Sequence, residues 1–401
     1  MTTTIIITIC TLLLLAYIFD ITSAKTKIPS VILLLVLGWI VRQGVDFFEL
    51  RVPNLTAILP VLGTVGLILI VLEGSLELEL NKAKFPMIGK SSLVAFFPML
   101  LFSFALAWAF HYFGNVSFKI ALANAIPLGI ISSAIAIPSA KNLSSESREF
   151  ITYESSLSDI FGVIFFNFIT LNDSIGSDSV WHFLLELVLI IIVSFVATLG
   201  LAFLLSRIKH HVKYVPIILL IVLIYSISKI YHLPALIFIL LFGLFLGNLD
   251  ELKGFKLIKK LHPEILDKEV HKFGELTTEI AFLIRALFFL LFGFLIETAE
   301  ILNLDTILWA VLITLGIYLL RIAFLKFVKI EFLPILFIAP RGLITILLFL
   351  SIPLGQTIIL ANKSLIIQVI ILTALVMMFG LMQTNKKNEK HTKETTTNEV
   401  I

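Results

Sequence analysis

Six ionisable residues stand inside otherwise apolar stretches of this sequence, where a charged side chain is costly and by default indicates function. Three are acids and three are bases: Glu73, Glu154, Asp159, Arg285, Arg321 and Arg341. Equal numbers of opposite charges can neutralise one another inside a helix bundle. Structural ion pairing is therefore the simplest interpretation of any one of them. We expect transport chemistry where one acid is left without a base.

The segment around Asp159 is expected to supply that unpaired acid. Glu154 and Asp159 are five residues apart, about 140° around a helix at 100° per residue, so they face different neighbours. One carboxylate can then be neutralised by an arginine while Asp159 stays free. Desolvation disfavours the charged form of a free carboxyl group, which suits the reversible binding of a proton.

Oxygen ligands for a small cation lie close to Asp159 in the sequence. Hard cations prefer oxygen, and no imidazole or thiolate cluster competes for a transition metal. Backbone carbonyls freed by an interrupted helix near residue 130 would add to four serine hydroxyls. These candidate ligands are Ser132, Ser133, Ser155 and Ser158. We therefore expect Na⁺ or K⁺ and H⁺ as transported substrates, with no resident cofactor and no catalytic residue.

The composition places these residues in a membrane. The 401 residues are 59% hydrophobic and only 14% charged, whereas soluble domains average roughly 25% charged residues. The mean hydropathy is +1.07. Cys10 is the single cysteine, so an intramolecular disulfide is excluded. A net charge of +3 is explained by basic loops rather than by nucleic-acid binding. No nucleotide-binding motif appears, so we expect no enzyme.

Apolar runs long enough to cross a bilayer recur along almost the whole chain. They predict an all-α polytopic membrane protein. The thirteen expected spans are 4–20, 27–43, 57–76, 90–112, 118–140, 148–171, 181–206, 214–231, 233–249, 275–297, 306–326, 332–353 and 364–383. Residues 250–274 are expected to form a polar, Lys-rich connection between two of them.

The loop charges predict the orientation, because Lys and Arg are retained on the cytoplasmic side. With the N-terminus outside, most of the 30 Lys and Arg residues fall in cytoplasmic segments. The outside keeps only Arg42, Arg51, Lys119, Lys229 and Lys363. The first apolar run lacks a cleavage signal and is expected to be retained. We expect a bacterial inner-membrane protein with its C-terminus in the cytoplasm.

The odd number of spans predicts two inverted repeats, the usual build of secondary transporters. Residues 1–383 would form the transmembrane domain, with a first repeat over 1–171, a linker helix over 181–206 and a second repeat over 214–383. Residues 384–401 would form a short charged tail. The fifth span of each repeat is interrupted by Pro and Gly, which predicts broken helices. The residues expected there are Pro127, Gly129, Pro138, Pro340 and Gly342.

At these positions the sequence resembles the monovalent cation:proton antiporter superfamily, and in particular the sodium/proton exchangers. The match spans nearly the whole chain, and five short motifs carry it in the right order. They are Glu73-Gly-Ser-Leu-Glu77, Ser132-Ser-Ala-Ile-Ala136, Glu154-Ser-Ser-Leu-Ser-Asp159, Phe288-Phe-Leu-Leu-Phe-Gly293 and Arg341-Gly342. Each motif is weak alone, and their order and spacing make the resemblance specific.

The resemblance implies that Asp159 binds the ion and the proton. It also implies that Glu154 pairs with Arg321 as a structural brace, and that Arg341 lies near Glu73 and Ser158. Ser158 stands where relatives carry Asn, Asp or Gln, and Ala134 stands where many carry Thr, so ion selectivity is not carried over. Three possibilities stay open for Arg285: it could brace Glu154, contact Asp159 or do neither.

We therefore expect a homodimeric antiporter, in contact with membrane lipids, that exchanges one monovalent cation for one proton. Na⁺ is the first choice of cation, and the exchange would be electroneutral, by alternating access. A potassium/proton antiporter of the same superfamily is the alternative transporter. A passive cation channel, or a membrane sensor that has lost transport, is the alternative of another class.

Overall fold

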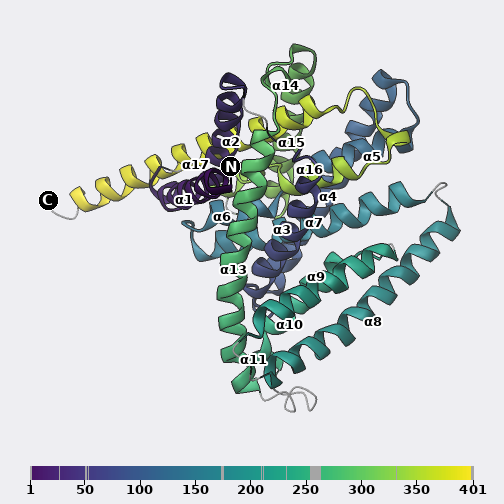
Figure 1. Ribbon diagram of the computed structural model, residues 1–401, viewed down its shortest axis with the longest axis vertical. Coiled ribbons are helices and arrows are strands. Elements are labelled where there is room, and N and C mark those ends of the chain that lie inside the picture. Colours follow the sequence, from purple (N-terminus) through teal and green to yellow (C-terminus); the bar gives the residue numbers. More distant parts are fainter. Residues whose placement is uncertain are drawn as a thin grey trace.

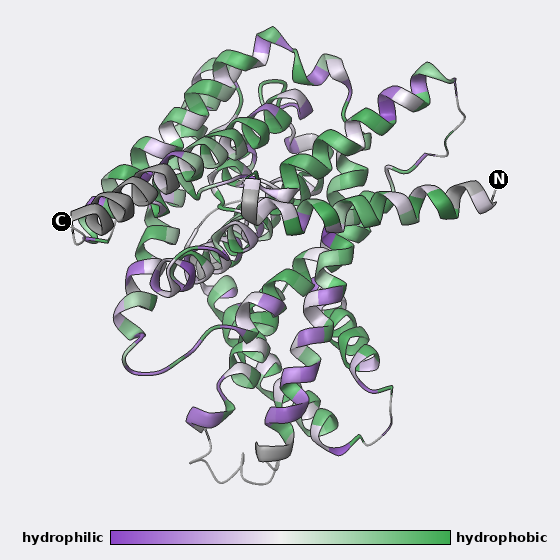
Figure 2. Cartoon of the chain, turned by 90° about the vertical axis from the view of Figure 1, so that its left-hand side faces the viewer, coloured by the Kyte–Doolittle hydropathy of each residue, from purple (hydrophilic) through white to green (hydrophobic). Residues whose placement is uncertain are grey.

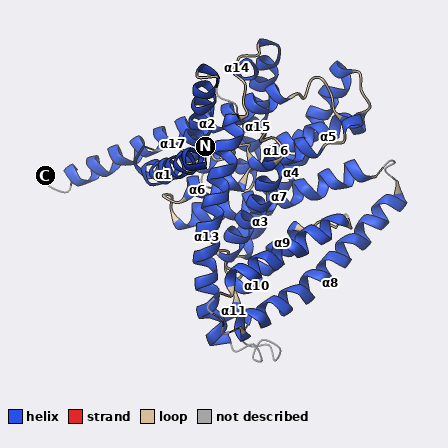
Figure 3. Cartoon of the chain, in the orientation of Figure 1, coloured by secondary structure: helices blue, strands red, loops and turns tan. Residues whose placement is uncertain are grey.

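The computed structural model describes residues 2–398 except 27, 50, 51, 53, 173–175, 209, 211, 232, 253–262 and 331. The described part of the chain is built of helices joined by loops, with no strand (Figure 3). The helix bounds, with the labels of Figure 1, are α1 Thr2–Thr26, α2 Ser30–Phe47, α3 Ile58–Leu76, α4 Phe85–Gly114, α5 Phe118–Gly129, α6 Ser133–Ala140, α7 Ser145–Leu171, α8 Ser177–Arg207, α9 Tyr214–Ile230, α10 Leu236–Gly247, α11 Leu249–Leu252, α13 Pro263–Phe294, α14 Thr298–Ile301, α15 Leu304–Phe327, η1 Ile335–Phe337, α16 Leu343–Ser351, η2 Leu354–Gln356 and α17 Lys363–Asn398.

The protein is an integral membrane protein. Within the described residues, ten helical segments are long and apolar enough to cross a bilayer, and α9 and α10 are shorter apolar helices. Their middle stretches are hydrophobic, whereas hydrophilic residues gather at helix ends and in loops (Figure 2). All thirteen expected spans contain helix. The count of thirteen crossings and the inverted repeats stay predictions.

Two helices extend beyond the apolar runs into segments that the sequence predicts to be polar. The helix α13 begins at Pro263, well inside the expected 250–274 connection. Its first turns place Leu266, Val270 and Phe273 in the core, at the i, i+4, i+7 spacing of one helix face. Residues 253–262 of this connection lie outside the described part. The helix α17 likewise continues through Asn398, beyond the predicted boundary at residue 383.

The helix α3 lies inside the bundle, with most of its side chains buried. Glycines let its neighbours approach closely: a Cβ on Gly243 of α10 would lie 1.9 Å from the Ser75 hydroxyl, and one on Gly247 would lie 2.4 Å from the Leu76 carbonyl oxygen. This Gly-x-x-x-Gly spacing is typical of tight helix pairs in membranes. Figure 1 shows α8 along one edge of the molecule, with α10 between α8 and α3.

Both expected broken helices are interrupted by non-helical backbone. The helix α5 ends at Gly129, and α6 begins at Ser133 after an extended Ile130 and Ser132. Nearer the C-terminus, residues 338–342 separate η1 from α16. The two interruptions meet, because the Ser132 N–H donates to the Pro340 carbonyl oxygen at 2.9 Å. Pro127 and Pro138 lie inside α5 and α6, not in the gap.

Candidate ion-binding site

Asp159 lies in the middle of α7, with its side chain 1% exposed. The Ser133 hydroxyl, at the first residue of α6, donates a hydrogen bond to its Oδ2. Its other oxygen, Oδ1, has no hydrogen-bond partner among the described residues. Asp159 also makes no ion pair within the part of the chain that the structure describes. A buried carboxyl group with one open oxygen can bind a proton or face a cation.

Local sequence explains how α7 and the gap come together at this point. The helix α7 starts at the N-cap Ser144, whose hydroxyl accepts from the Ser147 N–H. One turn beyond Asp159, Gly162 lets the extended segment approach α7: a Cβ there would lie 2.1 Å from Ile130 Cδ1. The Ser158 hydroxyl accepts from the Ile131 N–H at 3.0 Å. Ser158 therefore holds the gap against α7, beside Asp159.

The remaining candidate serines divide into satisfied and unsatisfied hydroxyls. Ser155 donates to the Ile151 carbonyl oxygen one turn earlier on the same helix, at 2.8 Å. Ser132, at the gap, is buried and its hydroxyl has no partner among the described residues. Ser156, which the sequence analysis did not select, is equally buried and unpartnered. Its position next to Ser155, inside the motif that ends at Asp159, could have marked it as a candidate ligand. Buried polar atoms without a partner are rare and call for an explanation.

Glu154 forms the ion pair that neutralises the other acid of this segment. Arg321 of α15 donates to both of its carboxylate oxygens, at 2.5 and 2.9 Å, and both side chains are buried. The same guanidinium donates to the carbonyl oxygens of Ile335 and Leu336 in η1. Arg321 therefore ties α7, α15 and the start of the second broken helix together. This is the pairing that the resemblance implied.

Arg341 binds backbone carbonyl oxygens on both sides of the crossing. Its guanidinium donates to the carbonyl oxygens of Leu128 and Gly129 at 2.8 and 3.1 Å, and to that of Ala339 at 2.8 Å. It makes no hydrogen bond to Glu73 or Ser158. The reason is that α5 ends at Gly129, so its last carbonyls lack intrahelical donors, and a cation is favoured at this negative end of the helix dipole.

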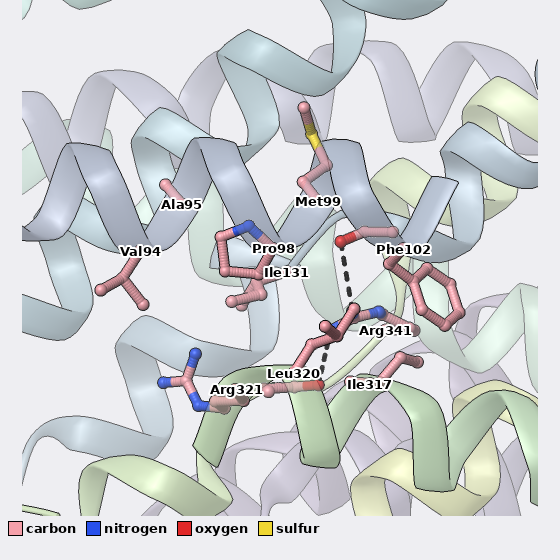
Figure 4. Close-up of a pocket in the computed structure, with 12 residues that line it drawn as sticks. Val94, Ala95, Pro98, Met99, Phe102, Ile131, Ile317, Leu320, Arg321 and Arg341 are labelled. Carbon is pink, nitrogen blue, oxygen red and sulfur yellow. Dashed lines mark hydrogen bonds between the residues drawn. The ribbon is translucent and has the colours of Figure 1, made fainter. Parts of the chain in front are cut away.

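A small cavity of about 20 Å³ lies beside Arg341, between α4, α15 and the point where the two helix interruptions meet. Figure 4 shows Arg341 joined by hydrogen bonds to backbone oxygens within this cavity wall, with Met99 and Phe102 above it and Arg321 pointing away. The volume suits about one water molecule. Asp159 does not line this cavity.

Glu73 of α3 faces Arg285 of α13, with Oε2 and Nη1 3.9 Å apart. This contact answers the question that the sequence left open for Arg285. The pair forms the floor of a cavity of about 260 Å³, whose rim carries the exposed Glu77, Lys141 and Arg148. We call it the charged vestibule.

The charged vestibule ends close to Asp159. Ile137 of α6 lines it, and Ser133, which binds Asp159, lies one turn earlier on the same helix. Four residues of helix rise about 6 Å. The part of α6 that lines the charged vestibule is therefore one helical turn away from the residue that binds Asp159. Among the described residues no group of three His, Cys, Asp or Glu side chains could hold a metal ion.

A helical membrane bundle in which two interrupted helices cross beside a buried acid is the build of a secondary transporter. Residues 10–384 match the sequence profile of the transmembrane sodium/hydrogen exchanger family, so the chain belongs to that family. The resemblance read from the sequence is thereby confirmed. No curated protein matches the chain significantly.

Solved structures support the same fold. The chain is similar to the sodium proton antiporter MjNhaP1 from Methanocaldococcus jannaschii at pH 8, with a TM-score of 0.65 and 17% identity over 95% of this chain and 96% of that one. An electron-microscopy structure of the same antiporter gives a TM-score of 0.68 and 17% identity, covering 96% of this chain and 95% of that one. The antiporter fold is therefore shared along the whole chain.

Proposed function

We propose that this protein is a homodimeric secondary transporter that exchanges one Na⁺ for one proton at Asp159, without net charge movement. One observation carries the proposal: of Glu73, Glu154 and Asp159, Asp159 alone has no basic partner in the described part of the chain, and it is fully buried. Glu154 is held by Arg321, and Glu73 faces Arg285. A single free carboxylate is enough to bind either one proton or one monovalent cation, because either of them neutralises its charge.

The mechanism rests on competition for that carboxylate. With either cargo bound, Asp159 is neutral, whereas the bare anion would pay a large desolvation cost in crossing the membrane. Oδ1 can offer oxygen lone pairs to a cation, and the Ser133 hydroxyl already binds the same carboxyl group. The hydroxyls of Ser132, Ser155 and Ser156 are the further oxygen ligands that we propose. The substrate cation is thus held by oxygen atoms alone, as a hard cation requires.

Alternating access is supported by where the charged vestibule lies. Its rim holds Lys141 and Arg148, which the loop charges assign to the cytoplasm. We therefore assign the vestibule as the inner entrance of an inward-facing arrangement. The broken helices would move with α7 against the other helices to open the opposite side. The mobile unit is held together by Arg321 and Arg341.

Proton flux in everted vesicles tests the proposal, with Na⁺, K⁺ and Li⁺ added in turn at one pH. We expect Na⁺ to release protons from the vesicle lumen in wild type and to have no effect in Asp159→Asn, which keeps the side-chain shape. A response to K⁺ alone would make the protein a potassium/proton antiporter. Cation conduction without proton movement would indicate a channel and contradict the proposal.

A further inference from the structure

A second cavity, of about 270 Å³, lies away from the ion path at the ends of three helices. We call it the basic pocket. It lies between the start of α4, the start of α7 and the end of α15, with η1 behind it. Its polar residues are Lys90, Glu146, Ser147 and Lys329, and its apolar residues are Ala83, Pro86, Met87, Phe150, Ile330 and Ile335. Neither Asp159 nor the charged vestibule contributes to it.

The two lysines of the basic pocket are free to bind a ligand. Both side chains are exposed, and neither ammonium group makes an ion pair or a hydrogen bond with another described residue. In contrast, the neighbouring Lys84 is paired with Glu149. The first turn of α7 adds to the positive potential, because helix N-termini attract anions. Glu146 is the one opposing charge in the wall, so the ligand meets two cations and one anion.

The pocket lies at the boundary between lipid and water. On α4, Lys90 stands at one end of a stripe of exposed apolar side chains at helical spacing, which marks the lipid-facing side of this helix. The stripe is Leu93, Phe97, Leu101, Phe104 and Trp108. Phe97 also stacks on Phe324 of α15, with ring centroids 6.4 Å apart. An acyl chain lying along Phe97 would bring its headgroup to Lys90.

We propose that the basic pocket binds the phosphate headgroup of an anionic phospholipid from the leaflet on the Lys-rich side. Basic pockets between transmembrane helices on the cytoplasmic side are suited to such headgroups. A cavity of about 270 Å³ has room for a phosphate and its glycerol. Lys90 and Lys329 contact the phosphate, while Met87 and Phe150 lie under the glycerol.

Phosphatidylglycerol binding to the detergent-purified protein tests this proposal, by native mass spectrometry or by the lipid-dependent rise in melting temperature. We expect phosphatidylglycerol to bind more tightly than phosphatidylcholine. The double variant Lys90→Gln/Lys329→Gln should weaken phosphatidylglycerol binding about 30-fold, about fivefold for each lysine. Glu146→Gln should strengthen it, because the opposing charge in the wall is removed.

The matched control is Lys82→Gln/Lys326→Gln, which removes the same charge from exposed lysines at the same end of the molecule, outside the pocket. It should retain binding within about twofold. Equal losses in the two double variants would reduce the effect to general surface charge and overturn the proposal. Free glycerol phosphate that binds as tightly as phosphatidylglycerol would also overturn it, because the ligand would then be a soluble phosphate.

Discussion

Arg321 and Glu154 meet in a two-point ion pair inside the bundle, with Nη1 and Nη2 of the arginine donating to Oε1 and Oε2 of the glutamate at 2.5 and 2.9 Å. The arginine uses its remaining donor capacity on the carbonyl oxygens of Ile335 and Leu336. Bidentate pairs of this kind are geometrically specific as well as strong. The contact holds α7, which carries Asp159, against α15 and against η1, the short helix just before the second interruption.

Breaking this pair on one side should destabilise the protein. Glu154→Gln strands the buried guanidinium, and removing one partner of a buried pair typically costs about 3–5 kcal/mol. We expect a larger fall in melting temperature in detergent for Glu154→Gln than for Asp159→Asn. Asp159 has no ion-pair partner among the described residues, so its substitution leaves no base unpaired.

The double variant Glu154→Gln/Arg321→Leu should recover part of that loss, because both charges of the pair are then removed and neither is left buried without its partner. Glu154→Gln/Arg285→Leu is the matched comparison, since Arg285 faces Glu73 instead. Rescue by Arg285→Leu, with none by Arg321→Leu, would contradict the assignment of the brace.

Arg341 should be essential to the crossing of the broken helices. Arg341→Leu leaves the carbonyl oxygens of Leu128, Gly129 and Ala339 without their donor, so we expect lower thermal stability and loss of exchange. Arg341→Lys should retain little of the stability and little exchange activity, because a single ammonium group cannot donate to all three carbonyl oxygens as the planar guanidinium does. Arg42→Leu, which removes a partly exposed pair with Asp46 and a contact over the Phe294 ring, is the control and should change stability by less than about 1 kcal/mol. Equal stability of the two leucine variants would refute this role.

Gly342 should tolerate no side chain, because the two interruptions touch there. A Cβ at this position would lie 2.6 Å from Ile135 Cδ1 and 3.0 Å from the Ser132 hydroxyl. Overpacking of this kind costs about 1–3 kcal/mol, so Gly342→Ala should lower both the melting temperature and the exchange rate. Gly44→Ala is the control, since nothing lies within 4 Å of its added Cβ. A Gly342→Ala variant as stable and active as wild type would rule out this close contact.

The sequence predicted which helices carry the site residues better than it predicted which side chains those residues contact. Glu154 and Asp159 could be separated by helix geometry alone, since five residues turn them to different neighbours. The partner of Arg285 could not be found in this way, because an arginine side chain reaches several helices and only packing decides between Glu73, Glu154 and Asp159. The carbonyl partners of Arg341 could not be found for the same reason: the bare carbonyls at the end of α5 exist only once the helix is known to stop at Gly129.

Exchange should be insensitive to the membrane potential. With Glu154 held by Arg321 and Ser158 unable to carry a charge, Asp159 alone changes its cargo. A potential is worth about 2.3 kcal/mol per elementary charge per 100 mV, and it has no net charge to act on in a one-for-one exchange. We expect a valinomycin-clamped potential to leave the equilibrium Na⁺ distribution in proteoliposomes unchanged. Na⁺ accumulation driven by the potential would overturn the stoichiometry while leaving antiport in place.

The release of protons on cation binding tests the competition at Asp159 most directly. Na⁺ would be titrated into the purified protein by calorimetry, in two buffers of different ionisation enthalpy, at a pH where the unloaded carboxyl group is protonated. We predict about one proton released for each Na⁺ bound in wild type and in the control Glu77→Gln, an exposed acid at the rim of the charged vestibule. We predict no proton release in Asp159→Asn. Undiminished proton release in Asp159→Asn would contradict the account, because the exchanged proton would then belong to another group.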